Sequence, residues 1–164
     1  MILSCLINRE LVLASASPRR REILDKFGIP FNVRIAKLNE EEYFSTQDPI
    51  SDVLKKISIE KAKRVRIPED KSMIVGADTI VVFKDNVLGK PKDRTEAENM
   101  LRSLSGQKHT VMTGIAIIDT VTDNSLSDVI STTVRFKNMS DNEIEWYLQD
   151  PEYKDKAGAY GIQG

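Results

Sequence analysis

Short apolar runs alternate along the chain with longer stretches in which apolar residues recur at helical spacing. The first pattern is typical of buried strands and the second of amphipathic helices. Strands are therefore predicted over 11–14, 31–35, 73–75, 80–83, 87–88, 110–119 and 130–136, and helices over 18–27, 49–65, 96–104 and 141–148. Because strands and helices mix throughout without an internal repeat, the predicted fold class is α/β.

Turn and capping residues set the boundaries of these elements. Ser17 is a good N-cap and Pro18 suits the first position of a helix, which Gly28 then ends. Asp85 and Asn86 predict the turn of a hairpin. Two later helices begin at expected capping boxes, formed by Thr95 with Glu98 and by Ser140 with Glu143.

The composition is that of one ordinary globular domain, or of two small lobes around one core. The 164 residues include 24 Lys+Arg and 25 Asp+Glu, for a formal net charge of −1. A chain so balanced is not a general binder of nucleic acid or of membrane surfaces. No stretch reaches the roughly 20 apolar residues of a membrane span. Met1 to Leu13 lack a signal-peptide pattern, so we predict a cytoplasmic protein.

Cysteine and histidine counts limit the redox and metal chemistry. Cys5 is the only cysteine and His109 the only histidine. These counts exclude an intramolecular disulfide and a zinc site built from several Cys or His residues. Any metal would be held by carboxylate and phosphate oxygens, which favours Mg²⁺ or Mn²⁺. His109 has no Ser or Cys partner motif and is interpreted as a structural or surface residue.

Ser15 to Arg21 is the strongest candidate for an anion site. A strand that runs into the start of a helix places free backbone N–H groups and the positive end of the helix dipole at one point. The consecutive arginines at 19–21 oppose that dipole, which suggests an anionic ligand. Guanidinium groups suit phosphate oxygens. A solvated basic helix start is an equally weighted alternative.

Three further segments carry candidate groups, each with a plainer alternative. Asp78 follows a predicted buried strand, where it could act as a general base or a metal ligand, or simply cap a turn. Lys90 is held extended by the proline after it and could meet a triphosphate, or be a surface lysine. In the glycine-rich tail, Tyr160 could stack on a base and Gln163 could read its edge, or the tail could be a flexible loop.

Six stretches together resemble the Maf family of nucleoside triphosphate pyrophosphatases along nearly the whole chain. They are Leu11 to Leu24, Glu60 to Lys63, Val75 to Val81, Leu88 to Pro91, Met100 to Gly114 and Asp155 to Gly164. The resemblance implies a Maf-type α/β fold, related to that of the inosine triphosphate pyrophosphatases, with a mixed sheet, flanking helices and two lobes around a substrate cleft. It also implies hydrolysis of a nucleoside triphosphate to the monophosphate and pyrophosphate, with a divalent metal cation as cofactor.

The resemblance assigns roles to individual residues. Asp78 matches the family's proposed catalytic base. Glu40 matches an acidic position near the metal, so Glu40 and Asp78 are the expected metal ligands. The expected substrate-binding residues are Ser15, Arg19, Arg20, Lys61, Lys90 and Gln163.

The choice of substrate follows from the subgroup that the chain resembles. One subgroup prefers dTTP and UTP and another acts on 7-methyl-GTP, and the residues here match the first. Arg20, Thr79 and Gln163 are the expected specificity positions. We therefore expect hydrolysis of dTTP and UTP, or of modified pyrimidine nucleotides. The alternative from another class is a nucleotide-binding regulatory module in cell division or septum formation, without turnover. No nucleic-acid or membrane partner is expected, and a homodimer is left open.

Residues 1–164 are expected to form a single Maf-like domain. Family members usually continue beyond Gly-Ile-Gln-Gly with strands and a final helix, so these elements are expected to be lacking here. A missing strand would expose a sheet edge, which favours association.

Overall fold

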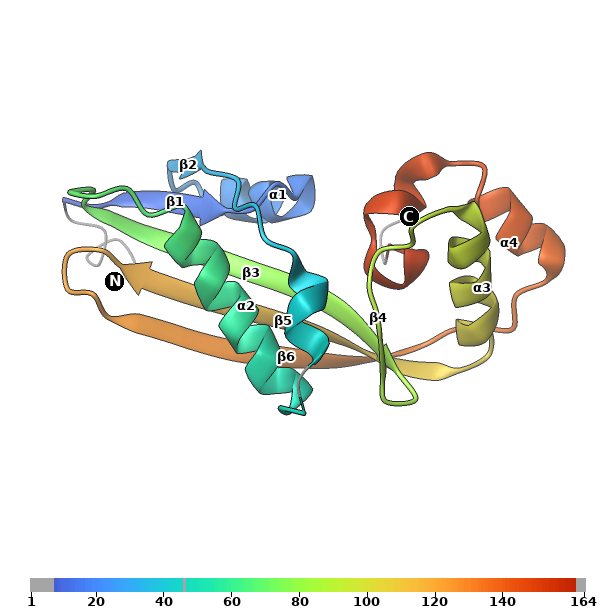
Figure 1. Ribbon diagram of the computed structural model, residues 1–164. Helices are drawn as coiled ribbons and strands as arrows, with labels where there is room; N and C mark the ends of the chain where they lie inside the picture. Colours follow the sequence, from blue (N-terminus) through green and yellow to red (C-terminus); the bar gives the residue numbers. More distant parts are fainter. Residues whose placement is uncertain (1–7, 46, 162–164) are drawn as a thin grey trace. The chain divides into compact units, whose positions relative to one another are not determined.

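The computed structural model describes residues 8–45 and 47–161, and its secondary structure mixes strands with helices as predicted (Figure 1). Cys5 and Gln163 lie outside the described residues. The strands are β1 (Glu10–Ala14), β2 (Phe31–Val33), β3 (Ser72–Phe83), β4 (Asn86–Leu88), β5 (Lys108–Asp119) and β6 (Ser125–Arg135). The helices are α1 (Pro18–Lys26), α2 (Ile50–Arg64), α3 (Arg94–Leu104) and α4 (Asp141–Tyr147), with 3-10 turns η2 (Glu40–Ser45), η3 (Pro151–Asp155) and η4 (Ala157–Ala159).

Within the described ranges, these strands form a six-stranded mixed sheet in the order β2-β1-β3-β5-β6, with β4 paired to β3. β1 runs parallel to both of its neighbours, and its Leu13 lies opposite Val33 of β2 and Val75 of β3. β5 and β6 are neighbours joined by residues 120–124. A connection this short joins antiparallel strands, so β5 and β6 run antiparallel.

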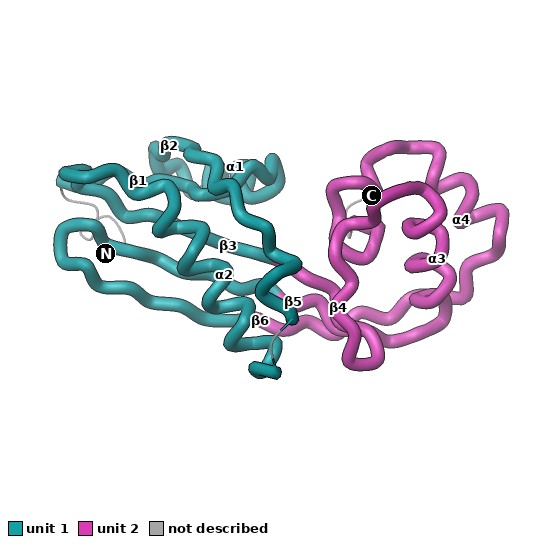
Figure 2. The backbone as a smooth tube through the Cα atoms, viewed as in Figure 1, with its two compact units in different colours: residues 1–78, 113–129 teal, residues 79–112, 130–164 magenta. Residues whose placement is uncertain are grey.

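The chain divides into two compact units (Figure 2). Unit 1 comprises residues 1–78 and 113–129, and unit 2 comprises residues 79–112 and 130–164. Each unit has a hydrophobic core of its own. Buried residues of the unit 1 core are Val12, Ala14, Ala62, Val65, Ile74 and Ile118, and those of the unit 2 core include Val81, Leu101, Leu104, Ile144, Leu148 and Tyr160. The division agrees with the two lobes that the resemblance implies.

β3 differs from its prediction in a way that moves a candidate residue. The sequence predicts two strands separated by a turn at 76–79, but β3 is one strand of 12 residues. Gly76 does not end it, because its backbone is extended and the missing side chain makes room for a neighbouring helix. Asp78 therefore lies inside β3, and the prediction that it follows the strand is wrong.

The start of α3 also differs. The predicted cap was Thr95 with Glu98, but the N-cap is Asp93, whose side chain accepts a hydrogen bond of 2.8 Å from the backbone N–H of Glu96. The Glu96 side chain in turn accepts a bond of 2.7 Å from the backbone N–H of Lys92. An aspartate two residues earlier offers the stronger cap, so the helix begins there.

The other boundaries follow the sequence more closely. Ser140 and Glu143 form the predicted capping box, and Ser17 is the N-cap residue of α1, with Pro18 in its first turn. Between the predicted strand at 31–35 and the predicted helix at 49–65, residues 40–45 form the 3-10 turn η2, whose three glutamates complement the positive end of the turn. β6 begins at Ser125 rather than Ile130, because its exposed side chains hide the strand pattern.

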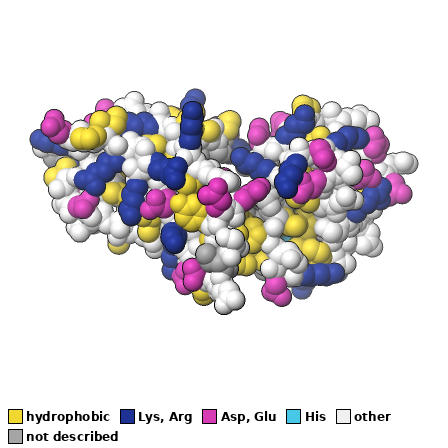
Figure 3. Space-filling view, viewed as in Figure 1, with side chains coloured by type: hydrophobic (Ala, Val, Ile, Leu, Met, Phe, Trp, Pro, Cys, Tyr) yellow, Lys and Arg dark blue, Asp and Glu magenta, His cyan; other side chains and the backbone are white. Residues whose placement is uncertain are grey.

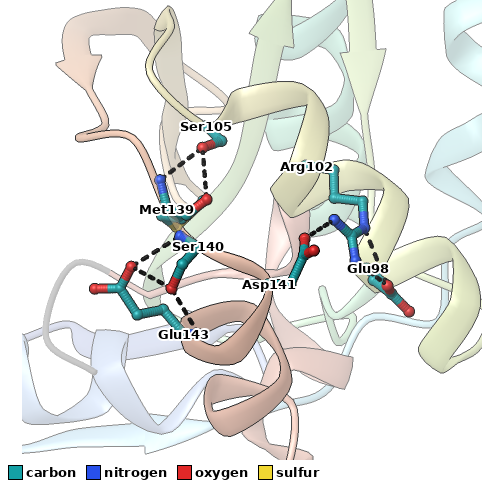
Figure 4. A network of polar contacts seen from close by, with 7 residues as sticks. All are labelled: Glu98, Arg102, Ser105, Met139, Ser140, Asp141 and Glu143. Atoms are coloured by element: carbon teal, nitrogen blue, oxygen red, sulfur yellow. Dashed lines mark hydrogen bonds and ion pairs between the residues drawn. The ribbon is translucent and has the colours of Figure 1, made fainter.

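In unit 2, polar contacts tie α3 to the start of α4 (Figure 4). Arg102 binds Asp141 and also Glu98, with 2.8 Å between Nη2 and Oε1 of the latter pair. The Ser105 hydroxyl accepts a bond of 2.7 Å from the backbone N–H of Met139. On the face shown in Figure 3, basic and acidic side chains are interspersed. Among the helices that the structure describes, none combines the length and apolar character needed to cross a membrane.

Candidate active site

One lysine and two carboxylates meet in unit 1. The Nζ atom of Lys61, on α2, lies 2.6 Å from Oδ1 of Asp78 on β3 and 2.7 Å from Oε1 of Glu40 in η2. The side chains of Lys61 and Asp78 are only 9% and 13% exposed. Lysine is almost never this buried without a partner of opposite charge. The structure therefore brings together three of the predicted site residues.

The packing of α2 on the sheet explains how Lys61 reaches Asp78. A Cβ on Gly76 would lie 2.1 Å from the carbonyl oxygen of Ser58, and a Cβ on Gly114 would lie 2.7 Å from the Ser58 hydroxyl. Only glycine allows the helix to approach β3 and β5 this closely. Asp78 is two residues along β3 from Gly76, so its side chain points to the same face, toward α2.

Sequence reasoning missed this role of Gly76 and Gly114. It interpreted the glycine before Asp78 as a sign of a turn. The sequence signal was the pair of small residues Ser58 and Ala62 on the predicted helix, because small residues on both partners allow close packing. Both are fully buried in the structure.

Ser15, at the end of β1, is bound to the start of α1. Nη1 of Arg20 donates to the Ser15 hydroxyl oxygen at 2.9 Å and to the carbonyl oxygen of Ala77 at 3.0 Å. The same hydroxyl oxygen accepts a bond of 3.2 Å from the backbone N–H of Ser17. A hydroxyl accepts two hydrogen bonds and donates one. Since both acceptor positions are used, any further bond of Ser15 is one it donates, as a phosphate oxygen requires.

Arg20 is electrostatically coupled to the carboxylate cluster. Burial lowers the pKa of Arg20 below its ordinary value, Asp78 raises it, Arg19 lowers it and Glu40 raises it. The arginine keeps its charge, because guanidinium groups stay protonated in proteins. Arg20 and Lys61 thus balance the charges of Glu40 and Asp78, and a triphosphate with about four negative charges would need further cations.

The first turn of α1 retains the features on which the anion-site prediction rests. It contains no acidic residue, and the Ser17 side chain makes no capping hydrogen bond there. Arg19 and Arg21 are exposed, whereas Arg20 is half-buried. Arg21 has no role that the structure explains.

Two of the predicted residues that the structure describes belong to unit 2. Thr79 follows Asp78 in β3, and because successive side chains of a strand alternate, it points to the opposite face of the sheet. Lys90 is exposed, just after β4. Gln163 lies outside the described residues, so its predicted role has no structural account.

Tyr160 and His109 lie in the interior of unit 2. Tyr160 is 9% exposed and packs against Phe136, with 4.6 Å between ring centroids. Its predicted stacking on a nucleotide base is wrong, because the ring is enclosed by the core. His109 is 4% exposed, which confirms the structural half of its interpretation.

The donor set of Glu40 and Asp78 fits a divalent cation. Mg²⁺ is usually bound by one or two carboxylates together with water and substrate phosphates. Both carboxylates converge on the Nζ of Lys61, so they lie near one another. No group of three or more His, Cys, Asp or Glu side chains suited to a metal occurs in the described part of the chain. A metal here would therefore take its remaining ligands from substrate and water.

Comparison with known proteins places this chain in a family. The family model described as Maf-like protein matches residues 10–164. A dTTP/UTP pyrophosphatase of Symbiobacterium thermophilum is 44% identical over 156 residues, covering 95% of this chain and 78% of the relative. One of Alkaliphilus oremlandii is 46% identical over 157 residues, covering 95% and 80%.

A solved structure supports the fold. The Ham1 protein of Staphylococcus aureus matches with a TM-score of 0.51 at 10% sequence identity, over 94% of this chain and 88% of that one. At this identity the match shows the fold alone. With the arrangement of strands and helices, it confirms the predicted α/β fold class.

Proposed function

Because this chain belongs to the Maf family, we propose that it is a nucleoside triphosphate pyrophosphatase that hydrolyses dTTP and UTP to the monophosphate and pyrophosphate. The structural observation that carries the proposal is the cluster of Glu40, Lys61 and Asp78. The substrates are those in the names of relatives at 44% and 46% identity. A chain with this activity would act on free nucleotide in the cytoplasm.

Asp78 is the proposed general base. Lys61 holds Oδ1 of Asp78 at 2.6 Å and so fixes the direction in which the carboxylate faces. A base must be held within hydrogen-bond reach of the proton that it removes. In the proposed reaction Asp78 takes a proton from water, the water oxygen bonds to phosphorus, and the α–β phosphoanhydride bond breaks to release pyrophosphate.

The basic groups of unit 1 are proposed to bind the triphosphate. Arg19 is exposed at the start of α1, where guanidinium and backbone N–H groups suit phosphate oxygens. Ser15 would donate its hydroxyl hydrogen to the same ligand. Arg20, bonded to Ser15 and to the backbone before Asp78, would join the phosphate-binding and catalytic parts of the unit.

The proposed metal-binding residues are Glu40 and Asp78. When bound, Mg²⁺ or Mn²⁺ would neutralise phosphate charge that develops on the leaving group. The two carboxylates would orient the cation and Lys61 would balance their charge. Lys90 and Gln163 as substrate-binding residues, and Arg20, Thr79 and Gln163 as specificity residues, remain proposals from the family resemblance.

The test is pyrophosphate release from a panel of dTTP, UTP, dATP, dCTP and 7-methyl-GTP, with Mg²⁺ or Mn²⁺. We expect dTTP and UTP to be the best substrates. Asp78→Asn should lower kcat by roughly 10²- to 10⁴-fold while the protein still binds dTTP. Asp52→Asn is the matched control, because that side chain is exposed on α2.

Two results would contradict the proposal. Nucleotide binding by the parent chain without pyrophosphate release would favour a regulatory module instead. A near-normal rate for Asp78→Asn would remove Asp78 as the base, and 7-methyl-GTP as the best substrate would overturn the proposed preference.

A further inference from the structure

A buried histidine–tyrosine pair in unit 2 has no part in the mechanism above. His109, on β5, has its Nε2 atom 2.6 Å from the hydroxyl oxygen of Tyr160. Both rings meet Phe136 edge to face, with centroids 5.0 Å away for His109 and 4.6 Å away for Tyr160. The pair is therefore fixed by a hydrogen bond and by aromatic packing at once.

Packing alone does not account for a histidine at this position. His109 Nδ1 is buried and has no hydrogen-bond partner among residues 8–45 and 47–161. An unsatisfied buried polar atom is costly, so an apolar side chain would fill the site at lower free-energy cost. What the imidazole offers beyond volume is the bond from Nε2 to Tyr160.

Tyr160 belongs to a short segment, residues 158–161, which we call the tail turn. Gly158 and Ala159 have φ angles of 68° and 64°, so both adopt the left-handed conformation. Alanine rarely adopts it, and such backbone persists only where the surroundings enforce it. Ala159 is completely buried, and the backbone N–H of Gly161 donates to the Tyr147 hydroxyl at 3.2 Å.

The tail turn is bonded to the residue before Lys90. The backbone N–H of Gly158 donates to the carbonyl oxygen of Gly89 at 2.9 Å. Gly158 also packs tightly on β3, because a Cβ there would lie 3.0 Å from a methyl carbon of Val81. The turn thus rests on β3 and on the backbone of Gly89 together. A shift of the turn would shift the backbone from which Lys90 extends.

We propose that His109 is a positioning residue for the substrate: by holding Tyr160 it fixes the tail turn against Gly89 and so places Lys90 for the triphosphate. This inference rests on the proposed function, in which Lys90 binds substrate. His109 itself touches no substrate, since it is buried. It acts through Tyr160, Gly158 and Gly89.

The bond is one between neutral groups at neutral pH. Burial lowers the pKa of His109 below its ordinary 6.5 and raises the pKa of Tyr160 to about 12. A neutral side chain that places nitrogen where Nε2 lies can therefore replace the histidine. The amide of glutamine reaches that place, whereas the shorter asparagine reaches only the place of Nδ1.

The first test compares His109→Gln with His109→Asn. We expect the asparagine variant to raise KM for dTTP roughly 3- to 10-fold, a change that corresponds to the free energy of one hydrogen bond, with a smaller change in kcat. The glutamine variant should keep a KM near that of the parent. Tyr160→Phe, which loses only the hydroxyl, should resemble the asparagine variant. Equal KM values for all four proteins would overturn the inference.

The second test asks whether the effect passes through Lys90. In a Lys90→Ala background, His109→Asn should raise KM by less than two-fold, because the residue that it positions is gone. Full additivity of the two substitutions would show that His109 acts elsewhere and would overturn the inference. Ser105→Ala is the control, because it removes a hydrogen bond of unit 2 outside the tail turn. It should lower Tm but leave KM unchanged.

Hydrogen exchange separates this inference from the proposed function. His109→Asn and Tyr160→Phe should speed exchange of the Gly158 and Gly161 amides in the protein without nucleotide, whereas His109→Gln should not. Unchanged exchange in all variants would overturn the positioning role even if pyrophosphate is released. A parent chain that releases no pyrophosphate, with faster exchange in the variants, would count against the proposed function while supporting the hold on the turn.

Discussion

Lys61 and Asp78 meet through a contact of 2.6 Å between Nζ and Oδ1, although one lies on α2 and the other on β3. The same Nζ lies 2.7 Å from Oε1 of Glu40. Two carboxylates near one another repel, and the ammonium group between them offsets that repulsion. The lysine is therefore as important to the arrangement as either acid.

Replacing Lys61 should damage both folding and activity. Lys61→Met keeps the length of the side chain but leaves the largely buried Asp78 and the half-exposed Glu40 without their cation. We expect kcat/KM for dTTP to fall roughly 10²-fold or more and Tm to drop. Lys63→Met is the matched control, because that side chain is 60% exposed two residues later. Comparable losses in the two variants would argue against a special role for Lys61.

Glu40→Gln should separate metal binding from the proton transfer assigned to Asp78. Glutamine keeps the size of the side chain but lacks the charge that attracts a cation. The Mg²⁺ concentration needed for half-maximal rate should rise roughly 10-fold or more, with most of kcat recovered at saturating Mg²⁺. Titration of Mg²⁺ at fixed dTTP measures this, with the exposed Glu41→Gln as control. If only the Glu41→Gln control raised the required Mg²⁺ concentration, the metal ligand would be Glu41 and not Glu40.

Gly76→Ala should move α2 away from β3. The added methyl group would meet the Ser58 carbonyl at 2.1 Å, so the helix must shift. We expect the free energy of unfolding to fall by roughly 1–3 kcal/mol, measured by urea denaturation, together with a loss of kcat. Gly89→Ala has no atom within 4 Å of its Cβ and should leave the unfolding free energy nearly unchanged. If both glycines tolerate alanine equally, the close packing of α2 is not needed.

His109 should make stability depend on pH in the weakly acidic range. Burial lowers its pKa below 6.5, so as pH falls through 6.5 the unfolded chain takes up a proton that the folded chain refuses. The stabilisation is complete above that pH and is lost progressively below it, toward the folded pKa. Because the chain has one histidine, His109→Gln should remove this slope. Urea denaturation from about pH 7.5 to about pH 5.5 measures it, and parallel curves would contradict the assignment.

The cap of α3 can be tested by two substitutions. Asp93→Ala removes the acceptor for the Glu96 N–H and should cost about 1 kcal/mol. Thr95→Ala should raise stability by roughly a few tenths of a kcal/mol, because Thr95 is exposed inside the helix rather than at its cap and alanine has the higher helix propensity. Thermal unfolding of the two variants side by side gives the comparison. A larger loss of stability for Thr95→Ala than for Asp93→Ala would favour the capping box of Thr95 with Glu98 that the sequence predicts.

Much of the fold follows from local patterns in the sequence. α2 and β5 lie where helical spacing and a long apolar run predict them, because burial of one face imposes its own period. β3 does not, because Gly76 suggests a turn. In the structure Gly76 instead makes room for Ser58 on α2. A contact between residues distant in sequence leaves no local signal.

The candidate site shows the same limit. The cluster of Glu40, Lys61 and Asp78 was expected from a family resemblance, and only the structure shows that their charged atoms meet. The bond between His109 and Tyr160 joins residues 51 positions apart, so no motif contains both. The aromatic ring interpreted as a surface for a base turned out to be part of the core.

The continuity of β3 has a practical consequence for altering substrate choice. Asp78 and Thr79 are consecutive residues, yet the pleat of the strand directs their side chains to opposite sides of the sheet. A saturation library at position 79, a proposed specificity residue, would therefore vary that side chain without crowding the acid beside it. A library at position 76, on the acid's own side, would mostly yield misfolded clones.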